Sequence, residues 1–167
     1  MRKKYLLLFF IFHFSFFISF SQNVEMTEKA PANVNGIEYG YIVKNEQTKS
    51  ASKEEFSRFE ITLYATNKSG CTKLYADRPQ DASGVNINTL VTFTCTNANG
   101  KRLTAKNGKL NVKDFNIRSK VNGVDVQVKA GYIFRNGETI KNNIIVLVPL
   151  NEKPVFQAMA EYLPELQ

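Results

Sequence analysis

The sequence contains almost none of the residue types on which most catalytic and metal sites depend. One of its 167 residues is histidine, none is tryptophan, and two are cysteine. The single histidine, His13, lies in a leader-like N-terminal segment. The rest of the chain therefore lacks the commonest general base and metal ligand. No Gly-x-Ser-x-Gly motif and no phosphate-binding loop occurs either. This composition favours a protein that is not an enzyme and holds neither a metal nor a cofactor.

The first 22 residues have the three-part layout of a secretory signal peptide. Basic residues occupy positions 2–4, an apolar and phenylalanine-rich run extends from Tyr5 to Phe20, and Ser21 and Gln22 end it. The run is short for a membrane-spanning helix, which needs roughly 17–25 residues, and no second apolar stretch follows. We expect residues 1–22 to be cleaved and the mature chain to be secreted, periplasmic or on the cell surface, without a membrane span. An uncleaved anchor is the alternative.

Removal of the leader changes the charge balance. Of the 22 Lys and Arg residues three lie at positions 2–4, which leaves 19 against 15 Asp and Glu, a net charge of +4 instead of +7. A mildly basic chain is soluble and has weak affinity for anions. The remaining length fits one domain with a core of its own.

Two cysteines, Cys71 and Cys95, remain in the mature chain. In an oxidising compartment an even number of cysteines favours pairing, and two allow a single connectivity. A bridge that closes a loop of this size stabilises by roughly 3 kcal/mol on the chain-entropy model. The sequence therefore predicts a Cys71–Cys95 disulfide; two separate buried thiols are the alternative.

Turn signals and alternating apolar residues predict an all-β fold. Asn-Gly, the pair preferred in two-residue hairpin turns, occurs five times. Apolar and polar residues alternate in most segments between these turns, most clearly from Val124 to Phe134. Residues 144–148 are apolar throughout, which predicts a central strand covered on both faces. We expect an Ig-like β-sandwich of seven or eight short strands over residues 36–167, with a small β-barrel as the alternative.

The two ends of the mature chain differ from this pattern. Residues 23–35 are polar, contain Pro31 and lack an apolar period, which predicts a flexible lead-in. After Pro154, apolar residues recur at steps of three and four, which predicts a short amphipathic helix over residues 154–163. We expect this helix to cover an end or an edge of the sandwich.

Positive charge gathers in one segment. Between positions 101 and 129, eight basic residues face two acidic ones, Asp114 and Asp125. If neighbouring strands align these side chains, a basic stripe results that binds an anionic glycan or another polyanion. The alternative is a solvated face whose lysines prevent edge-to-edge pairing. The candidate anion-binding residues are Lys101, Arg102, Lys106, Lys109, Lys113, Arg118, Lys120 and Lys129.

Other candidate sites are weaker. Asp77 and Asp81 bracket a proline-containing loop and are candidate paired carboxylates of a hydrolase. The same two residues with Ser83 and Asn86 supply oxygen donors for calcium, but the spacing matches no known calcium loop. Tyr64 is the tyrosine expected to be exposed for sugar binding.

Taken together, these patterns predict a secreted, non-enzymatic binding or accessory module that contacts an envelope protein or an anionic glycan. A small carboxylate-dependent, carbohydrate-active hydrolase and a structural envelope component are the alternatives. Nucleic acid is not an expected partner, because the compartment is wrong and no aromatic residues interleave the charges.

Overall fold

The structure is a computed structural model that describes residues 22–51, 54–77, 88–97, 99–101, 103, 108–161 and 163–166. These residues form eleven strands in three antiparallel sheets, which confirms the all-β prediction but not the predicted number of seven or eight strands. The strands are β1 (Gln22–Met26), β2 (Ala32–Val34), β3 (Ile37–Ala51), β4 (Glu54–Asn67), β5 (Lys73–Tyr75), β6 (Thr89–Thr96), β7 (Lys109–Asn111), β8 (Lys113–Val121), β9 (Val124–Phe134), β10 (Thr139–Pro149) and β11 (Val155–Ala160).

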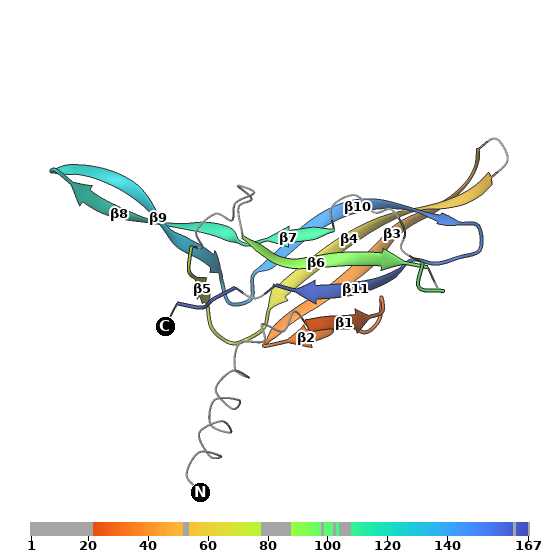
Figure 1. Cartoon of the computed structure of the whole chain (residues 1–167), viewed down its shortest axis with the longest axis horizontal. Coiled ribbons are helices and arrows are strands. Elements are labelled where there is room, and N and C mark those ends of the chain that lie inside the picture. The colour runs from red at the N-terminus through yellow and green to blue at the C-terminus, as the bar shows by residue number, and fades with distance from the viewer. Residues whose placement is uncertain are drawn as a thin grey trace, which may run out of the picture.

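Two of the sheets form a sandwich. One has the strand order β1-β11-β6-β7 and the other β10-β4-β3-β2. Their edges approach each other on both sides, because β1 contacts β2 and β7 contacts β10. Figure 1 shows these two layers as the body of the molecule.

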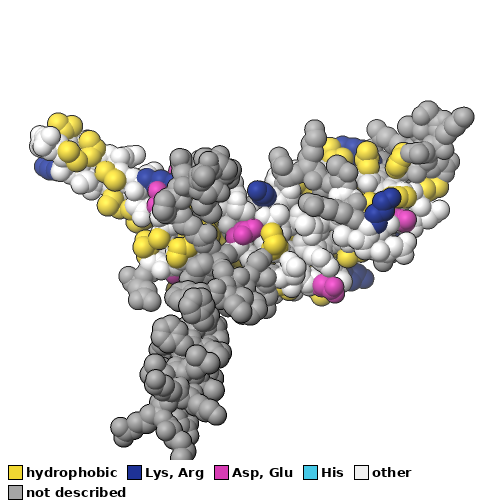
Figure 2. Space-filling view, in the orientation of Figure 1, with side chains coloured by type: hydrophobic (Ala, Val, Ile, Leu, Met, Phe, Trp, Pro, Cys, Tyr) yellow, Lys and Arg dark blue, Asp and Glu magenta, His cyan; other side chains and the backbone are white. Residues whose placement is uncertain are grey.

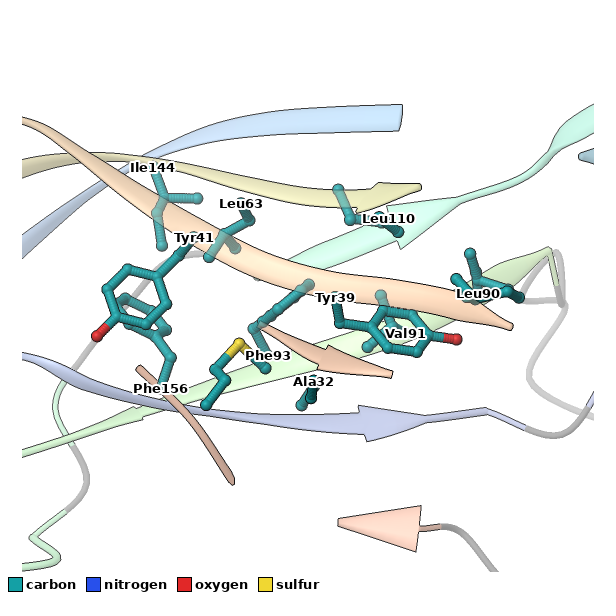
Figure 3. Close-up of a cluster of buried hydrophobic side chains, with 14 of the residues drawn as sticks. Ala32, Tyr39, Tyr41, Leu63, Leu90, Val91, Phe93, Leu110, Ile144 and Phe156 are labelled. Carbon is teal, nitrogen blue, oxygen red and sulfur yellow. The ribbon is translucent and has the colours of Figure 1, made fainter. Parts of the chain in front are cut away.

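The core lies between the two layers and follows the alternation of the sequence. Phe59, Ile61 and Leu63 of β4 are buried in this core, as are Val91 and Phe93 of β6, and the residues between them point to the opposite face of their sheet. Figure 3 shows side chains of both sheets in one cluster, in which the rings of Tyr41 and Phe156 lie 4.7 Å apart between centroids. Tyr39 and Tyr41 are therefore core residues.

Two Asn-Gly pairs form the tight turns that their sequence predicts. Asn35 and Gly36 have φ angles of 52° and 77° and join β2 to β3, and Asn122 and Gly123 have 52° and 83° and join β8 to β9. Positive φ at both central positions defines the type I′ turn, which asparagine and glycine tolerate.

The C-terminal helix predicted over residues 154–163 is wrong. Residues Val155–Ala160 form β11, which pairs with β6 on one side and β1 on the other. Phe156 and Ala158 are buried at a two-residue step, so tertiary pairing overrides the three- and four-residue spacing. Across the described ranges no helix has the length and apolar character needed to cross a membrane.

The lead-in predicted over residues 23–35 also differs from the structure. It contains most of β1 and all of β2, and Met26 and Ala32 enter the core. Alternation in the sequence does not mark these two strands, because they are short and bury few side chains. The predicted signal peptide lies outside the described residues, except for Gln22, the first residue of β1.

The apolar run at residues 144–148 does not form a doubly covered strand. It lies in β10, at the edge of its sheet. Ile144, Val146 and Val148 face the core, but Ile145 and Leu147 are about half exposed, at 52% and 55%.

The third sheet, β5-β9-β8, extends away from the two facing layers. Figure 1 shows the β8–β9 hairpin projecting at one end, far from the facing layers. Apolar residues alternate at Leu110 and Val112 and again at Phe115 and Ile117, and the one-residue slip between the two pairs is where the chain passes from β7 to β8. Val112, between them, is buried, so it fixes the point at which the chain changes sheets.

Candidate functional site

The projecting hairpin is sparsely covered by the rest of the described chain, since no residue of β8 is buried, and we call its residues 115–129 the arm. Strand β9 is divided between arm and body. Tyr132 and Phe134, near its end, are buried, whereas Val124 and Val128 are 62% and 43% exposed. The arm is therefore a two-stranded ribbon that extends beyond the core.

One face of the arm carries mostly aliphatic side chains and the other carries polar ones. Paired residues of antiparallel strands lie on the same face, so the register Ile117↔Val128, Ser119↔Val126 and Val121↔Val124 gathers the aliphatic side chains on one side. We call this side the apolar arm face; it consists of Phe115, Ile117, Ser119, Val121, Val124, Val126 and Val128. The opposite, polar arm face consists of Asn116, Arg118, Lys120, Asp125, Gln127 and Lys129.

The apolar arm face is exposed over most of its length. Ile117 and Val121 are 44% and 51% exposed, in addition to Val124 and Val128. Figure 2 shows hydrophobic side chains along the arm at the left of the molecule. Four large aliphatic side chains side by side on one protruding ribbon form a contiguous patch, and such patches mark interaction sites in soluble proteins.

A β-bulge at the base of the arm turns the aliphatic residues away from the core. Phe115 pairs with Gly131 and Asn116 with Lys129, so Ala130 is an extra residue in β9. One extra residue reverses which face the following side chains occupy. Val128 consequently lies on the face opposite to that of Tyr132, and the arm's valines do not continue the surface that packs into the body.

Lys129 fixes the base of the arm. Its Nζ donates a hydrogen bond to Tyr132 Oη at 3.0 Å and lies 4.1 Å from the centroid of that ring. It also lies 3.3 Å from Asp77 Oδ1 and 3.5 Å from Asp114 Oδ1. The hydrogen bond to Tyr132, with the two carboxylates, raises the pKa of Lys129 above its usual range.

Strand β5 joins this base to the body. It pairs with the buried end of β9, and Lys73 Nζ lies 2.6 Å from Glu165 Oε1. The Ala76 backbone N–H donates to the Pro164 carbonyl and the Leu166 N–H to the Leu74 carbonyl. The C-terminal segment therefore lies along β5, opposite β9.

The predicted basic stripe is divided between several surfaces. Lys101 is exposed at the turn after β6, and Lys109 is exposed on β7. Lys113 lies on the face of β8 that carries Phe115, and its Nζ lies 2.5 Å from Glu138 Oε1. Arg118 and Lys120 lie on the polar arm face, where Lys129 also lies. Arg102 and Lys106 are outside the described residues.

The Glu138 carboxylate is held by Lys113 and by the backbone of the turn at Arg135. Burial favours the neutral carboxyl group, but hydrogen bonds from Lys113 Nζ and from the Arg135 backbone N–H outweigh it and lower the pKa of Glu138 below its usual value. Lys113 is therefore engaged in a structural ion pair.

The predicted Cys71–Cys95 disulfide is wrong for this structure, in which both residues are free thiols. Cys71 is exposed in the turn between β4 and β5, whereas Cys95 is buried in β6 inside the sandwich. Burial raises the pKa of the Cys95 thiol to about 12, so this thiol is protonated at neutral pH.

Of the remaining candidates, the structure describes Asp77 and Tyr64. Asp77 belongs to the Lys129 cluster, whereas Asp81, Ser83 and Asn86 lie outside the described residues. Among the residues that the structure describes, no group of three His, Cys, Asp or Glu side chains is arranged to hold a metal ion. Tyr64 is partly buried, because its ring lies over Gly40 on the neighbouring strand.

A shallow depression of about 270 Å³ lies on the outer face of the β10-β4-β3 layer. Its lining contains one carboxylate, Glu60, which pairs with Arg58. The other lining residues are Lys44, Ile61, Thr62, Asn143, Ile144 and Ile145. A carboxylate-dependent glycosidase needs two acids that flank the substrate.

Comparison with known protein families, with curated proteins and with solved structures finds no match to this chain.

Proposed function

We propose that the chain is a secreted, non-enzymatic binding or accessory module that contacts a protein partner through the apolar arm face. In this proposal residues 1–22 are a cleaved signal peptide, and cleavage after Gln22 leaves Asn23–Met26 of β1. The two facing antiparallel layers, with an Ig-like arrangement, are the rigid body that holds the arm. The observation that carries the proposal is the exposed aliphatic face on a projecting hairpin.

The chemistry of this face favours a protein over a glycan. Flat sugar-binding surfaces usually present aromatic rings, but the exposed part of the arm face consists of Ile117, Val121, Val124 and Val128. Aliphatic β-branched side chains pack well on a second apolar protein surface. Arg118 and Lys120, on the other side of the ribbon, favour a partner with acidic groups at the rim of its apolar site.

An anionic glycan is the second candidate, and the exposed Lys101 and Lys109 with the polar arm face support it. The glycan is the weaker candidate because the basic residues are divided between several surfaces, whereas binding a polyanion requires neighbouring positive charges. Retention on a polyanion matrix at low salt, lost on charge reversal of Arg118 and Lys120, would favour the glycan over a protein partner.

Site-specific photo-cross-linking in the native envelope tests the proposal. A photoreactive amino acid replaces Val124 on the apolar arm face in one variant and Gln127 on the polar arm face in the matched control. We expect the Val124 position to form adducts with one protein species and the Gln127 position to form few. Equal adducts from both positions, or none from either, would contradict contact through the apolar arm face.

A further inference from the structure

We propose that two copies of this chain pair through the outer edge of β8, which makes the arm one half of a four-stranded sheet. This inference rests on the proposed function in one respect, that the arm is an interaction element. It goes further by assigning the edge of β8 to a second copy and leaving the apolar arm face to the partner.

The edge of β8 is available for pairing. Strand β8 ends the sheet order β5-β9-β8, and among the described strands it pairs with β9 alone. The bulge at the base of the arm places its extra residue in β9, so β8 runs without interruption from Lys113 to Val121. A long regular edge strand is a ready template for another strand, and a lone two-stranded ribbon is only marginally stable in water.

The turn geometry shows which backbone groups point outwards. In a two-residue hairpin the flanking pair, here Val121 and Val124, exchanges hydrogen bonds across the ribbon. Alternate residues of β8 then point their N–H and C=O groups to the open edge. These are the even-numbered residues, so an antiparallel copy must align even positions with even positions.

One such alignment uses the whole strand. A two-fold axis through Ile117, the midpoint of β8, pairs Lys113 with Val121 of the second copy and every residue between. It places Arg118 opposite Asn116 and Lys120 opposite Asp114, twice in the dimer. Directly opposite residues on neighbouring strands have Cβ atoms about 4.5–5.5 Å apart, which suits an ion pair.

Other alignments with the same parity are poorer. A two-fold axis through Arg118 places this residue opposite itself, and an axis through Ser119 places Arg118 opposite Lys120. Like charges directly opposite each other destabilise a sheet. An axis through Asn116 gives a favourable Asp114–Arg118 pair but leaves the outer end of β8 unpaired. Charge and length together therefore select the axis through Ile117.

The charged groups needed for this pairing are accessible. The Asp114 side chain is 54% exposed although it lies near Lys129, and Lys120 is exposed with no ion pair within the described ranges. Because the axis is perpendicular to the sheet, both apolar arm faces lie on the same side of the dimer. The result is a bivalent surface on four strands, built from two copies of the arm.

Sedimentation of the purified mature chain over a range of concentrations tests the pairing. We expect a monomer–dimer equilibrium for the natural chain and at least ten-fold weaker association for Lys120→Glu and for Asp114→Lys. The double variant Asp114→Lys/Lys120→Glu should restore association, because it exchanges the two charges. Lys101→Glu, an exposed charge reversal outside the arm, is the matched control and should associate normally.

A chain that stays monomeric at all concentrations overturns the proposal, as does a dimer that the single variants leave intact or the double variant fails to restore. Lys120→Glu disrupts no ion pair of the described chain, so it keeps the test valid if Asp114→Lys does not fold. Cross-linking from position 124 separates the two proposals. If the natural chain is monomeric but forms adducts from position 124, the proposed function is supported and the pairing is rejected. If the chain dimerises but forms no adducts, the pairing is supported and the proposed function is rejected.

Discussion

Gly131 lies directly against the backbone carbonyl of Tyr75: a Cβ atom at position 131 would be 2.2 Å from Tyr75 O. The φ angle of Gly131 is 144°, a conformation that side chains rarely adopt. This contact is where the bulge of β9 meets β5, so one glycine permits both the close approach of the strands and the change of face at the base of the arm.

The substitution Gly131→Ala should lower the free energy of unfolding by about 3 kcal/mol, because backbone strain of about 1–3 kcal/mol is joined by a clash with backbone that cannot move aside. Gly123→Ala is the matched control. Gly123 also has a positive φ, but nothing lies within 4 Å of its Cβ position. Urea denaturation followed by circular dichroism measures both; equal losses would show that the contact with Tyr75 is unimportant.

Asn67 is buried and fully hydrogen-bonded, and its loss should destabilise the body. Its Nδ2 donates to the Cys71 and Phe134 carbonyls, and its Oδ1 accepts from the Ser69 N–H and hydroxyl. Because Asn67→Leu removes four hydrogen bonds at a buried position, including the buried one to the Phe134 carbonyl, we expect a loss of about 3 kcal/mol in denaturant melts. Asn111→Leu, at an exposed position of β7, should change stability by less than about 0.5 kcal/mol; a similar loss in both variants would refute the role of the network.

The two cysteines should differ in reactivity. In the native protein at pH 8, iodoacetamide should modify Cys71 and leave Cys95 unmodified, because Cys95 is buried and its pKa is raised to about 12. Both should react after unfolding without a reductant. Peptide mass spectrometry reads out the labels. A protein that takes up no label until it is reduced contains a disulfide, in conflict with this structure.

The substitution Glu138→Gln should have a pH-dependent effect. The folded state lowers the pKa of Glu138, so its ionised form stabilises the fold above the unfolded pKa of about 4.3, and this contribution is lost as the pH falls through the lower folded value. The natural chain should therefore exceed the variant in stability at pH 7 and approach it at pH 3. Thermal melts at both values test this, and a constant difference would exclude the ionic contribution.

The sequence predicts the body of the fold because turns and alternation are local properties. The Asn122-Gly123 turn and the alternation of β4 and β6 can both be recognised in the sequence. Long-range strand pairing cannot be recognised in this way. The segment after Pro154 has helical spacing, yet it lies between β1 and β6, where only an extended chain completes the sheet.

The arm also shows that the sequence predicts a strand but not its long-range surroundings. Alternation from Val124 to Phe134 predicts one continuous strand, and the structure confirms that strand. Alternation does not reveal that Ala130 is an extra residue or that the side chain of Val128 is left exposed. An Asn-Gly turn between two alternating apolar runs is the signal that marks an amphipathic hairpin, but whether its apolar face is covered depends on distant strands.

The most direct test of the account compares partner capture by the natural chain with capture by the double variant Ile117→Thr/Val128→Thr. Both residues are exposed on the apolar arm face, so the variant should keep its free energy of unfolding to within about 1 kcal/mol. The account predicts that the protein cross-linked at position 124 is no longer recovered with this variant. Full recovery with a folded variant would contradict the claim that the apolar arm face is the binding surface.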